Sequence, residues 1–352
     1  MTNAQAEVPA GRAIVLRQTL SWVWTVFGPF LGLVLITALF AALTRESGSF
    51  LSLYNWRTIA VQTVIVGTAA LGMTMIMIAG GIDLSVGSTV ALVTVCMAVF
   101  VKKVDPSLPE SLRAWKLALP AALVLGVGLG GLCGAINGSL IAGLRVVPFI
   151  ITLGSYQVYR GLAKWLSSST TVYVPGEAKP WWFGRILATE PEPSWLLVAP
   201  GVWVLLGLSI LMAIMLRYSL LGRYAYAVGS NEATARLCGI NVPGIKIVVY
   251  TLGGLATGLA GVLQFVYLDA LGDPTTASGL ELEVIAAVVI GGGSLSGGEG
   301  TVLGTLIGCM IMSVLKNGCV HAGIPNASQD ILIGIIIVVA VALDRLRRRR
   351  GI

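Results

Sequence analysis

Long apolar blocks separated by short polar breaks dominate this chain and constrain its fold more than any other feature. One block, TIAVQTVIVGTAALGMTMIMIA at residues 58–79, is long enough to cross a bilayer, which takes about 20 apolar residues in a helix. Of the 352 residues, 56% are hydrophobic and 11% are charged, whereas about a quarter of an ordinary soluble domain is charged. The sequence therefore predicts an all-α polytopic membrane protein.

About ten transmembrane helices are predicted when the chain is cut at its polar and Gly/Pro-rich breaks. Several segments are shorter than a bilayer is thick, which indicates short or broken helices within the membrane. Unwound backbone at that depth is tolerated only where protein or a watery cavity surrounds it. The predicted limits are residues 23–43, 58–79, 86–101, 117–136, 146–166, 196–216, 246–268, 283–291, 302–317 and 331–343.

The predicted organisation is an N-terminal segment (1–22), one transmembrane domain (23–343) and a basic tail (344–352). No cleavable signal peptide is apparent, because the polar N-terminal segment leads directly into a full-length span. An even number of spans places both termini on one side, and the five arginines after the last span mark that side as cytoplasmic. The net charge of +7 is explained by such topology signals, so no nucleic-acid partner is expected.

The outer loop, residues 167–195, contains three tryptophans and four prolines. This composition is typical of a periplasmic segment that lies at the membrane surface, where tryptophan is enriched. The loop is either a docking surface for a partner or a passive interfacial segment.

The inner loop, residues 217–245, contains the stretch SNEATARLCGI, which predicts a short helix. Ser230 or Asn231 is the expected N-cap, Glu232 lies in the first turn, where the helix dipole favours an acid, and Gly239 is the expected stop. A short capped helix on the cytoplasmic side is suited to receive force from another protein.

An aspartate lies among glycines in GGIDLSVGS, directly after the apolar run 58–79. A charge at that depth is costly unless it is partnered or functional. We expect Asp83 to cap the following helix through the N–H groups of Ser85 and Val86, or to bond a serine near Ser294 and Ser296. The alternative is a gate or a direct solute ligand.

The same motif has an internal echo. GGIDLSVG (80–87) and GGGSLSGG (291–298) are identical at five of eight positions, which is compatible with two related structural halves. Chance overlap of glycine-rich stretches is the equally weighted alternative. The glycines that mark the predicted breaks are Gly80, Gly81, Gly87, Gly291, Gly292 and Gly293.

Other glycines recur at every fourth residue, and such small-residue faces allow membrane helices to pack closely. They predict a dense helical core rather than a binding site. They are Gly126, Gly130, Gly134 and Gly138, the pair Gly254 and Gly258, and Gly300, Gly304 and Gly308.

Catalytic chemistry has little support in the sequence. A single histidine, His321, excludes the H-E-x-x-H type of metal site, and the absence of the dipeptide Gly-Lys excludes a Walker A sequence. The five cysteines show no C-x-x-C spacing and are interpreted as small core residues. We therefore expect no catalytic residues, no cofactor and no metal in this chain, and any ATPase would be a separate polypeptide.

Solute transport remains, and the lack of a charged relay in mid-span points to a neutral solute and an external energy source. Polar residues within the spans are candidates for the path, although each is equally compatible with a helix–helix hydrogen bond. These candidates are Gln62, Asp83, Asn137, Tyr156, Gln157, Gln264 and Asn317.

Four stretches in order resemble the permease subunit of ribose-type sugar ABC importers, which include ribose, xylose, arabinose and galactofuranose systems. They are ALGMTMIMIAGGIDLSVGS, LRVVPFIITLGSYQVYRGLA, AVGSNEATARLCGINVPGIKI and LELEVIAAVVIGGGSLSGGEGTVLGTLIG. The resemblance covers the chain from about residue 56 to residue 342.

This resemblance implies an ABC importer permease fold in the bacterial inner membrane that imports a neutral monosaccharide by alternating access. The implied partners are a cytoplasmic ATPase with two nucleotide-binding halves, a periplasmic sugar-binding protein and a second permease copy or a paralogue. The implied coupling helix would use Ser230, Asn231, Glu232, Ala233, Arg236 and Gly239. Glu232 to Gly239 spans seven positions where the EAA signature of the wider importer class has six, so this role rests on location.

Two alternatives belong to other functional classes. A stand-alone facilitator or ion-coupled carrier would work without an ATPase. A membrane-embedded enzyme would need a catalytic constellation that the sequence does not provide.

Overall fold

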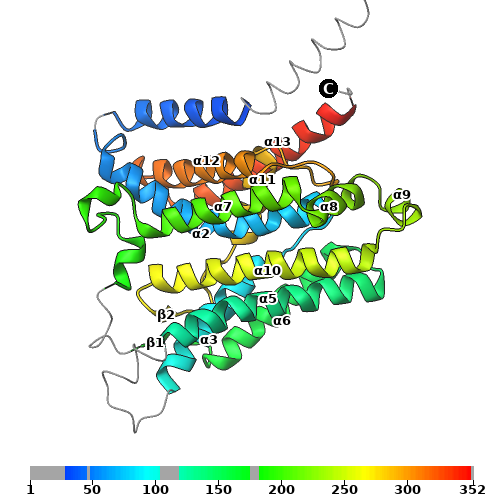
Figure 1. Ribbon diagram of the computed structural model, residues 1–352. Helices are drawn as coiled ribbons and strands as arrows, with labels where there is room; N and C mark the ends of the chain where they lie inside the picture. The colour runs from blue at the N-terminus through cyan, green and yellow to red at the C-terminus, as the bar shows by residue number, and fades with distance from the viewer. Residues whose placement is uncertain (1–27, 46–47, 104–118, 175–181, 350–352) are drawn as a thin grey trace, which may run out of the picture.

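The computed structural model describes residues 28–45, 48–103, 119–174 and 182–349, and these are mostly helical (Figure 1). The predicted N-terminal segment 1–22, the start of the first predicted span, the middle of the outer loop and the last residues of the tail lie outside the described residues.

A helix is found at each of the ten predicted segments. The first of these is Gly28–Leu43. The others are α2 (Leu53–Ile78), α3 (Val86–Lys103), α5 (Leu119–Leu144), α6 (Pro148–Leu166), α7 (Pro200–Tyr218), α10 (Val242–Tyr267), α11 (Leu280–Ile290), α12 (Val302–His321) and α13 (Asn326–Arg349). The connecting elements are β1 (Val172–Tyr173), η2 (Gly184–Leu187), η3 (Ser194–Leu196), α8 (Leu220–Ser230), α9 (Glu232–Leu237) and β2 (Leu271–Gly272).

Six of the described helices are long and apolar enough to cross a membrane: α2, α3, α5, α7, α10 and α12. The prediction of about ten transmembrane helices is therefore not confirmed. The helix α6 carries Arg160 and Lys164, and α11 is 11 residues long. The apolar helix Gly28–Leu43 and the apolar part of α13, Asn326–Val339, are shorter than the six.

The start of α2 shows how local chemistry sets a helix boundary. The Ser52 hydroxyl accepts a hydrogen bond from the Asn55 N–H at 3.2 Å, and the helix begins at Leu53, five residues before the predicted limit. A serine N-cap satisfies one of the free N–H groups of the first turn. α2 is buried along most of its length, and it packs against α7, α10, α11 and α12.

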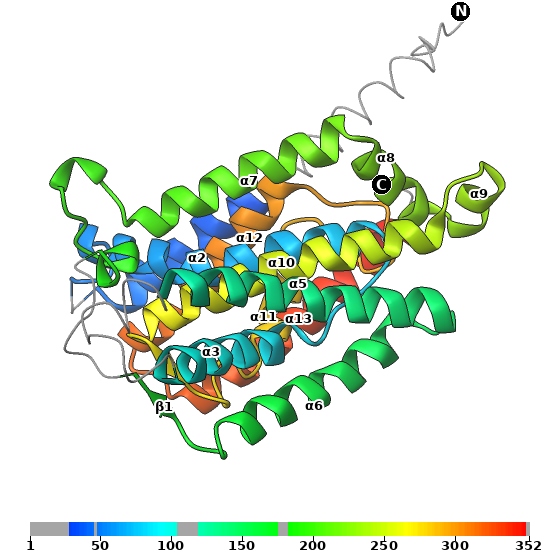
Figure 2. The same cartoon turned by 60° about the horizontal axis from the view of Figure 1, so that its bottom comes forward.

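α5 and α10 pack with their backbones in close contact, and the glycines that recur at every fourth residue lie at this interface. A Cβ atom at Gly254 would lie 2.8 Å from the Cα of Gly134, and one at Gly258 would lie 3.0 Å from the Cα of Gly130. Only glycine permits this backbone approach. Figure 2 shows α5 alongside α10, with α6 and α7 on opposite flanks of the bundle.

The bundle has two different ends (Figure 1). α8 and α9 protrude at one end, where the C-terminal end of α13 also lies. At the other end β1 pairs antiparallel with β2, with Val172 opposite Gly272, so the outer loop is joined to the segment before α11. Apolar side chains such as Val124, Val158 and Ile210 are exposed along the sides, as expected where helices face hydrocarbon.

Candidate solute cavity and coupling surface

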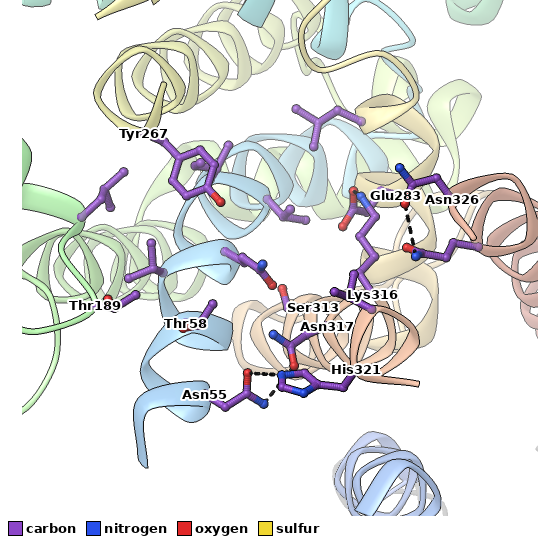
Figure 3. Close-up of a pocket in the computed structure, with 18 of the residues that line it drawn as sticks. Asn55, Thr58, Thr189, Tyr267, Glu283, Ser313, Lys316, Asn317, His321 and Asn326 are labelled. Atoms are coloured by element: carbon purple, nitrogen blue, oxygen red, sulfur yellow. Dashed lines mark hydrogen bonds and ion pairs between the residues drawn. The ribbon is translucent and has the colours of Figure 1, made fainter. Parts of the chain in front are cut away.

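A cavity of about 1050 Å³ lies at the end of the bundle opposite to α9, with walls from α2, α10, α11, α12 and α13 (Figure 3). Its polar lining comes largely from two helix faces. On α2, Asn55, Thr58 and Gln62 line it, and on α12, Ser313 and Asn317 do so together with Lys316. Spacings of three and four residues place such side chains on one face of a helix. The cavity therefore lies between two polar faces.

The outer part of the cavity is a closed hydrogen-bond network. The Asn55 amide donates to Asn317 Oδ1 at 2.9 Å and to the Phe50 carbonyl at 2.8 Å. His321 Nε2 lies 3.0 Å from Asn55 Oδ1, and Ser49 Oγ lies 3.2 Å from His321 Nδ1. Figure 3 shows Asn55, Asn317 and His321 together. This network ties the start of α2 to the end of α12.

Three charged side chains line the cavity, Glu283, Lys316 and Asp330, and the first two of them are paired. Lys316 Nζ donates to Glu283 Oε2, which comes from the first turn of α11, and the Glu283 side chain is buried. An acid in the first turn of a helix is also favoured by the helix dipole. A lysine and a glutamate in contact cancel each other's charge, so this pair offers hydrogen bonds without a net charge.

The predicted path residues separate into three groups. Gln264 and Asn317 line the cavity, as does Gln62. Asp83 and Asn137 lie in a buried network described below. Tyr156 is half-buried beneath the Arg160 guanidinium, 5.6 Å from its ring centre, and Gln157 is exposed on the outer side of α6.

The Asp83 carboxylate is buried and partnered. Its Oδ1 accepts hydrogen bonds from the Ser85 N–H at 2.8 Å and the Ser85 hydroxyl at 2.6 Å. Asn137 on α5 donates to the same hydroxyl at 2.9 Å, and Tyr159 on α6 lies 3.1 Å from Asn137 Oδ1 and 3.0 Å from the Cys133 carbonyl. The expected bond from the Ser85 N–H to Asp83 is present, but Ser85 precedes α3, which begins at Val86, so Asp83 closes the turn before this helix. The network joins that turn to α5 and α6.

We expect Asp83→Ala to lower the free energy of unfolding by about 1–3 kcal/mol, because Ser85 would keep a buried N–H and hydroxyl without an acceptor. Asp83→Asn retains an oxygen at this position and should lose less. Thermal unfolding of the two variants in nanodiscs measures the difference. Equal midpoints for Asp83→Ala and the unaltered protein would contradict the role of Asp83 as the acceptor for Ser85.

The two glycine motifs end their preceding helices in the same way. Gly80 (φ 77°) and Gly292 (φ 90°) each adopt the left-handed conformation after a helix. The N–H groups of Gly81 and Gly293 each bond the carbonyl five residues earlier, at 2.9 and 2.8 Å. This is the Schellman arrangement, which glycine accommodates without strain.

A second shared feature follows each of these turns. The Ser85 N–H bonds the Asp83 side chain, and the Ser296 N–H bonds the Ser294 hydroxyl at 3.2 Å. Each motif also lies between two helices, α2 and α3 in one case and α11 and α12 in the other. The alignment of residues 80–87 with residues 291–298 pairs Asp83 with Ser294 and Ser85 with Ser296, as these turns do. The left-handed glycines are shifted by one residue, because the alignment pairs Gly80 with Gly291 whereas the structure pairs it with Gly292.

The two glycine motifs contact each other beside the C-terminal end of α8. The Gly298 N–H donates to the Ile78 carbonyl at 2.9 Å. A Cβ atom at Gly297 would lie 2.7 Å from the Gly229 carbonyl oxygen and 2.8 Å from the Cα of Gly80. The end of α8 is therefore in backbone contact with both motifs.

The predicted short coupling helix is α9 (Glu232–Leu237), and a separate helix, α8, precedes it. α8 ends at Ser230, and Asn231 Oδ1 caps α9 by accepting from the Thr234 N–H at 2.9 Å. Gly239 has φ 79° just beyond the end of α9, as predicted for the stop. A one-residue break at the extended Asn231 separates α8 from α9, and the sequence pattern did not indicate this break.

α9 is fixed to the bundle through Glu232. Glu232 Oε1 accepts from Arg236 at 2.6 Å, and Oε2 accepts from Lys246 on α10 at 2.8 Å. Partial burial raises the pKa of Glu232, but the hydrogen bonds and charges of Lys246 and Arg236 outweigh it, so the pKa lies below its ordinary value. At the other end of α9 the Leu237 side chain is 88% exposed, which leaves an apolar contact point on the protruding tip.

The anchoring of α9 should depend on pH. Because the pKa of Glu232 is lowered in the folded protein, its contribution is complete at neutral pH and is lost on acidification below about pH 4, the ordinary range for a glutamate. The pair is half-exposed, so the effect is local and at most about 1 kcal/mol. Hydrogen exchange should show faster exchange of α9 amides in Glu232→Gln at pH 7. Unchanged exchange would contradict the anchor.

The family model described as branched-chain amino acid transport system / permease component matches residues 55–341. The chain belongs to this permease family. Ribose import permease protein RbsC of Escherichia coli (strain K12) is 37% identical over 322 residues, which cover 90% of this chain and 93% of the relative. The resemblance to ribose-type sugar import permeases is thereby confirmed.

Other relatives of this permease also carry sugar-import names. Fructose import permease protein FrcC of Rhizobium meliloti is 33% identical over 319 residues, covering 90% of this chain and 85% of the relative. D-allose transport system permease protein AlsC of Escherichia coli (strain K12) is 34% identical over 324 residues, covering 92% of each chain. No solved structure is significantly similar to the chain.

Several residues that line the cavity were not among the path residues predicted from the sequence. Asn55 lies before the predicted start of α2, and Ser313 and Lys316 were not selected. The spacing of Ser313, Lys316 and Asn317 is the signal that could have found them, because it places three polar side chains on one face of an apolar helix. Glu283 could be paired with Lys316 only once α11 and α12 were known to be neighbours.

Proposed function

We propose that this permease is the membrane-spanning subunit of an ATP-binding-cassette importer that moves a neutral monosaccharide by alternating access. The observation that carries the proposal is the cavity at the end opposite to α9, lined mainly by amides and hydroxyls, by the paired charges of Glu283 and Lys316, and by the exposed Asp330. Amide and hydroxyl groups suit a polyhydroxylated solute, and a paired charge does not attract ions. The ribose, fructose and allose permeases among its relatives support this solute class.

The proposed orientation places α9 and both termini in the cytoplasm and the cavity on the periplasmic side of a bacterial inner membrane. The basic end of α13 supports it, because cytoplasmic segments of membrane proteins are rich in Lys and Arg. In this orientation residues 23–343 form the transmembrane domain, residues 217–245 the cytoplasmic coupling loop and residues 167–195 the periplasmic loop.

Energy would come from a separate ATPase with two nucleotide-binding halves that contacts α9. The residues proposed for this contact are Ser230, Asn231, Glu232, Ala233, Arg236 and Gly239, together with the exposed Leu237. A periplasmic sugar-binding protein would deliver the solute at the cavity, and a second copy of this chain or a paralogue would complete the permease. ATP-driven closure would move α9, and the contact of α8 with both glycine motifs would carry that movement into the bundle.

Within the membrane, Gln264 and Asn317 are the proposed path residues at the cavity. Asp83 and Asn137 are assigned to structural support, because their polar groups are bonded to each other through Ser85 and to neighbouring helices. Gln157 lies away from the cavity on the outer side of α6, where a second permease copy or lipid would contact it.

Reconstituted uptake tests this proposal. The chain is incorporated into proteoliposomes with the ATPase and binding protein encoded beside it, and labelled ribose, fructose and allose are offered in turn. We expect uptake of one sugar that requires ATP and the binding protein. Sugar flux through the chain alone, independent of ATP, would instead support a facilitator or an ion-coupled carrier.

A further inference from the structure

The interface between α2 and α12 carries polar side chains at three levels. These helices run antiparallel, since α2 starts and α12 ends at the cavity. At the outer level the Asn55 amide bonds Asn317 at 2.9 Å. At the level nearest α9, the hydroxyls of Thr74 and Thr305 lie 2.7 Å apart. Each of these contacts joins one residue of α2 to one of α12.

Gln62 and Ser313 occupy the level between these two bonded pairs. Both side chains line the cavity. Gln62 Oε1 and Ser313 Oγ are nevertheless buried and have no hydrogen-bond partner among the residues that the structure describes. Ser313 is 2% exposed. The middle level is therefore the part of the interface where buried polar atoms are left unsatisfied.

Unsatisfied buried polar atoms are rare, since each costs about 1–3 kcal/mol. Neighbouring threonines show the usual arrangement: Thr58 Oγ1 donates to the Tyr54 carbonyl at 3.1 Å, and Thr63 Oγ1 donates to the Ile59 carbonyl at 2.8 Å. Packing alone would be better served by apolar side chains at positions 62 and 313. Polar atoms at these two positions are explained if a solute in the cavity provides their missing hydrogen-bond partners.

We propose that Gln62 and Ser313 form a sugar-hydroxyl contact at the floor of the cavity and act as positioning residues for the passing solute. This inference rests on the proposed function. Gln62 Oε1 can accept a hydrogen bond from a solute hydroxyl, and Ser313 Oγ can both donate and accept, which matches the dual character of a sugar hydroxyl. The contact selects neutral polyols, because neither residue carries a charge.

A stability test separates this role from a structural one. Ser313→Ala and Gln62→Leu remove the unsatisfied atoms at little cost in volume, so we expect thermal unfolding midpoints equal to or above that of the unaltered protein. Thr63→Val is the matched control, because Thr63 lies on the same helix outside the cavity lining and its hydroxyl is already bonded to the Ile59 carbonyl. A structural role for Gln62 and Ser313 would lower the midpoint of their variants.

The functional readout is the number of sugar molecules imported per ATP hydrolysed, measured with the complete complex and the sugar that the unaltered protein imports best among ribose, fructose and allose. We expect this ratio to fall about five- to tenfold in Ser313→Ala and Gln62→Leu, with ATP hydrolysis retained, and to stay unchanged in Thr63→Val. An unchanged ratio in both variants, or a loss of midpoint that accounts for reduced uptake, would overturn the inference. Failure of the proposed function is distinguishable, because the unaltered complex would then show no ATP-dependent uptake.

Discussion

Gly134→Ala is expected to destabilise the permease strongly, by about 3 kcal/mol, at the upper end of the usual effect of overpacking. The added Cβ would lie 2.9 Å from the Cα of Gly254 and would also meet the Tyr250 carbonyl. Both obstacles are backbone of α10, so no side chain can rotate away and the two helices would have to separate. Thermal unfolding in nanodiscs should show a clearly lowered midpoint.

Gly128→Ala is the matched control on the same helix. A Cβ atom at Gly128 would meet no other atom within 4 Å, and the residue is exposed. Alanine is also the better helix former, by about 1 kcal/mol. We therefore expect Gly128→Ala to leave the midpoint unchanged or slightly raised. Equal midpoints for the two variants would contradict the close packing of α5 and α10.

Gly229→Ala is expected to reduce sugar uptake at least about tenfold, which corresponds to 1.4 kcal/mol. The added Cβ would lie 2.6 Å from the Gly298 nitrogen and against the Ile78 carbonyl group. It would therefore push α8 away from both glycine motifs at once. In our account this contact carries movement of α9 into the bundle, so ATP hydrolysis should continue while import fails.

Gly207→Ala on α7 is the corresponding control, because a Cβ atom there meets nothing within 4 Å. It should import sugar at the normal rate. Normal uptake in Gly229→Ala, with intact assembly, would contradict the role of α8 as the connection between α9 and the glycine motifs.

Much of the helical framework could be predicted from the sequence, because apolar run length and glycine spacing report directly on membrane helices. The glycines four residues apart predict close helix packing, but they do not say that α5 and α10 are the helices that meet. The bond from the Ser85 N–H to Asp83 was expected from their separation of two residues along the chain. The limits were less predictable. α2 starts at a serine cap five residues early, and α13 continues to Arg349 although the predicted span ended at residue 343.

The cavity was harder to predict than the helices. Asn317 and Gln264 were identified as polar residues in apolar runs, but so was Gln157, which the structure places on the outer side of α6. A polar residue in an apolar helix indicates that its side chain has a hydrogen-bond partner, but it does not indicate which neighbour provides that partner. That choice depends on which helix faces which, and α11 and α12 bring Glu283 to Lys316 only through tertiary packing.

The most direct test of the account is ATP hydrolysis by the complete complex in nanodiscs. The permease is assembled with the ATPase encoded beside it, and the cognate binding protein is added with and without ribose, fructose or allose. We expect the binding protein loaded with one of these sugars to stimulate hydrolysis above the level seen with the empty binding protein. Failure of the permease to assemble with any ATPase, together with sugar flux through the permease alone, would contradict it.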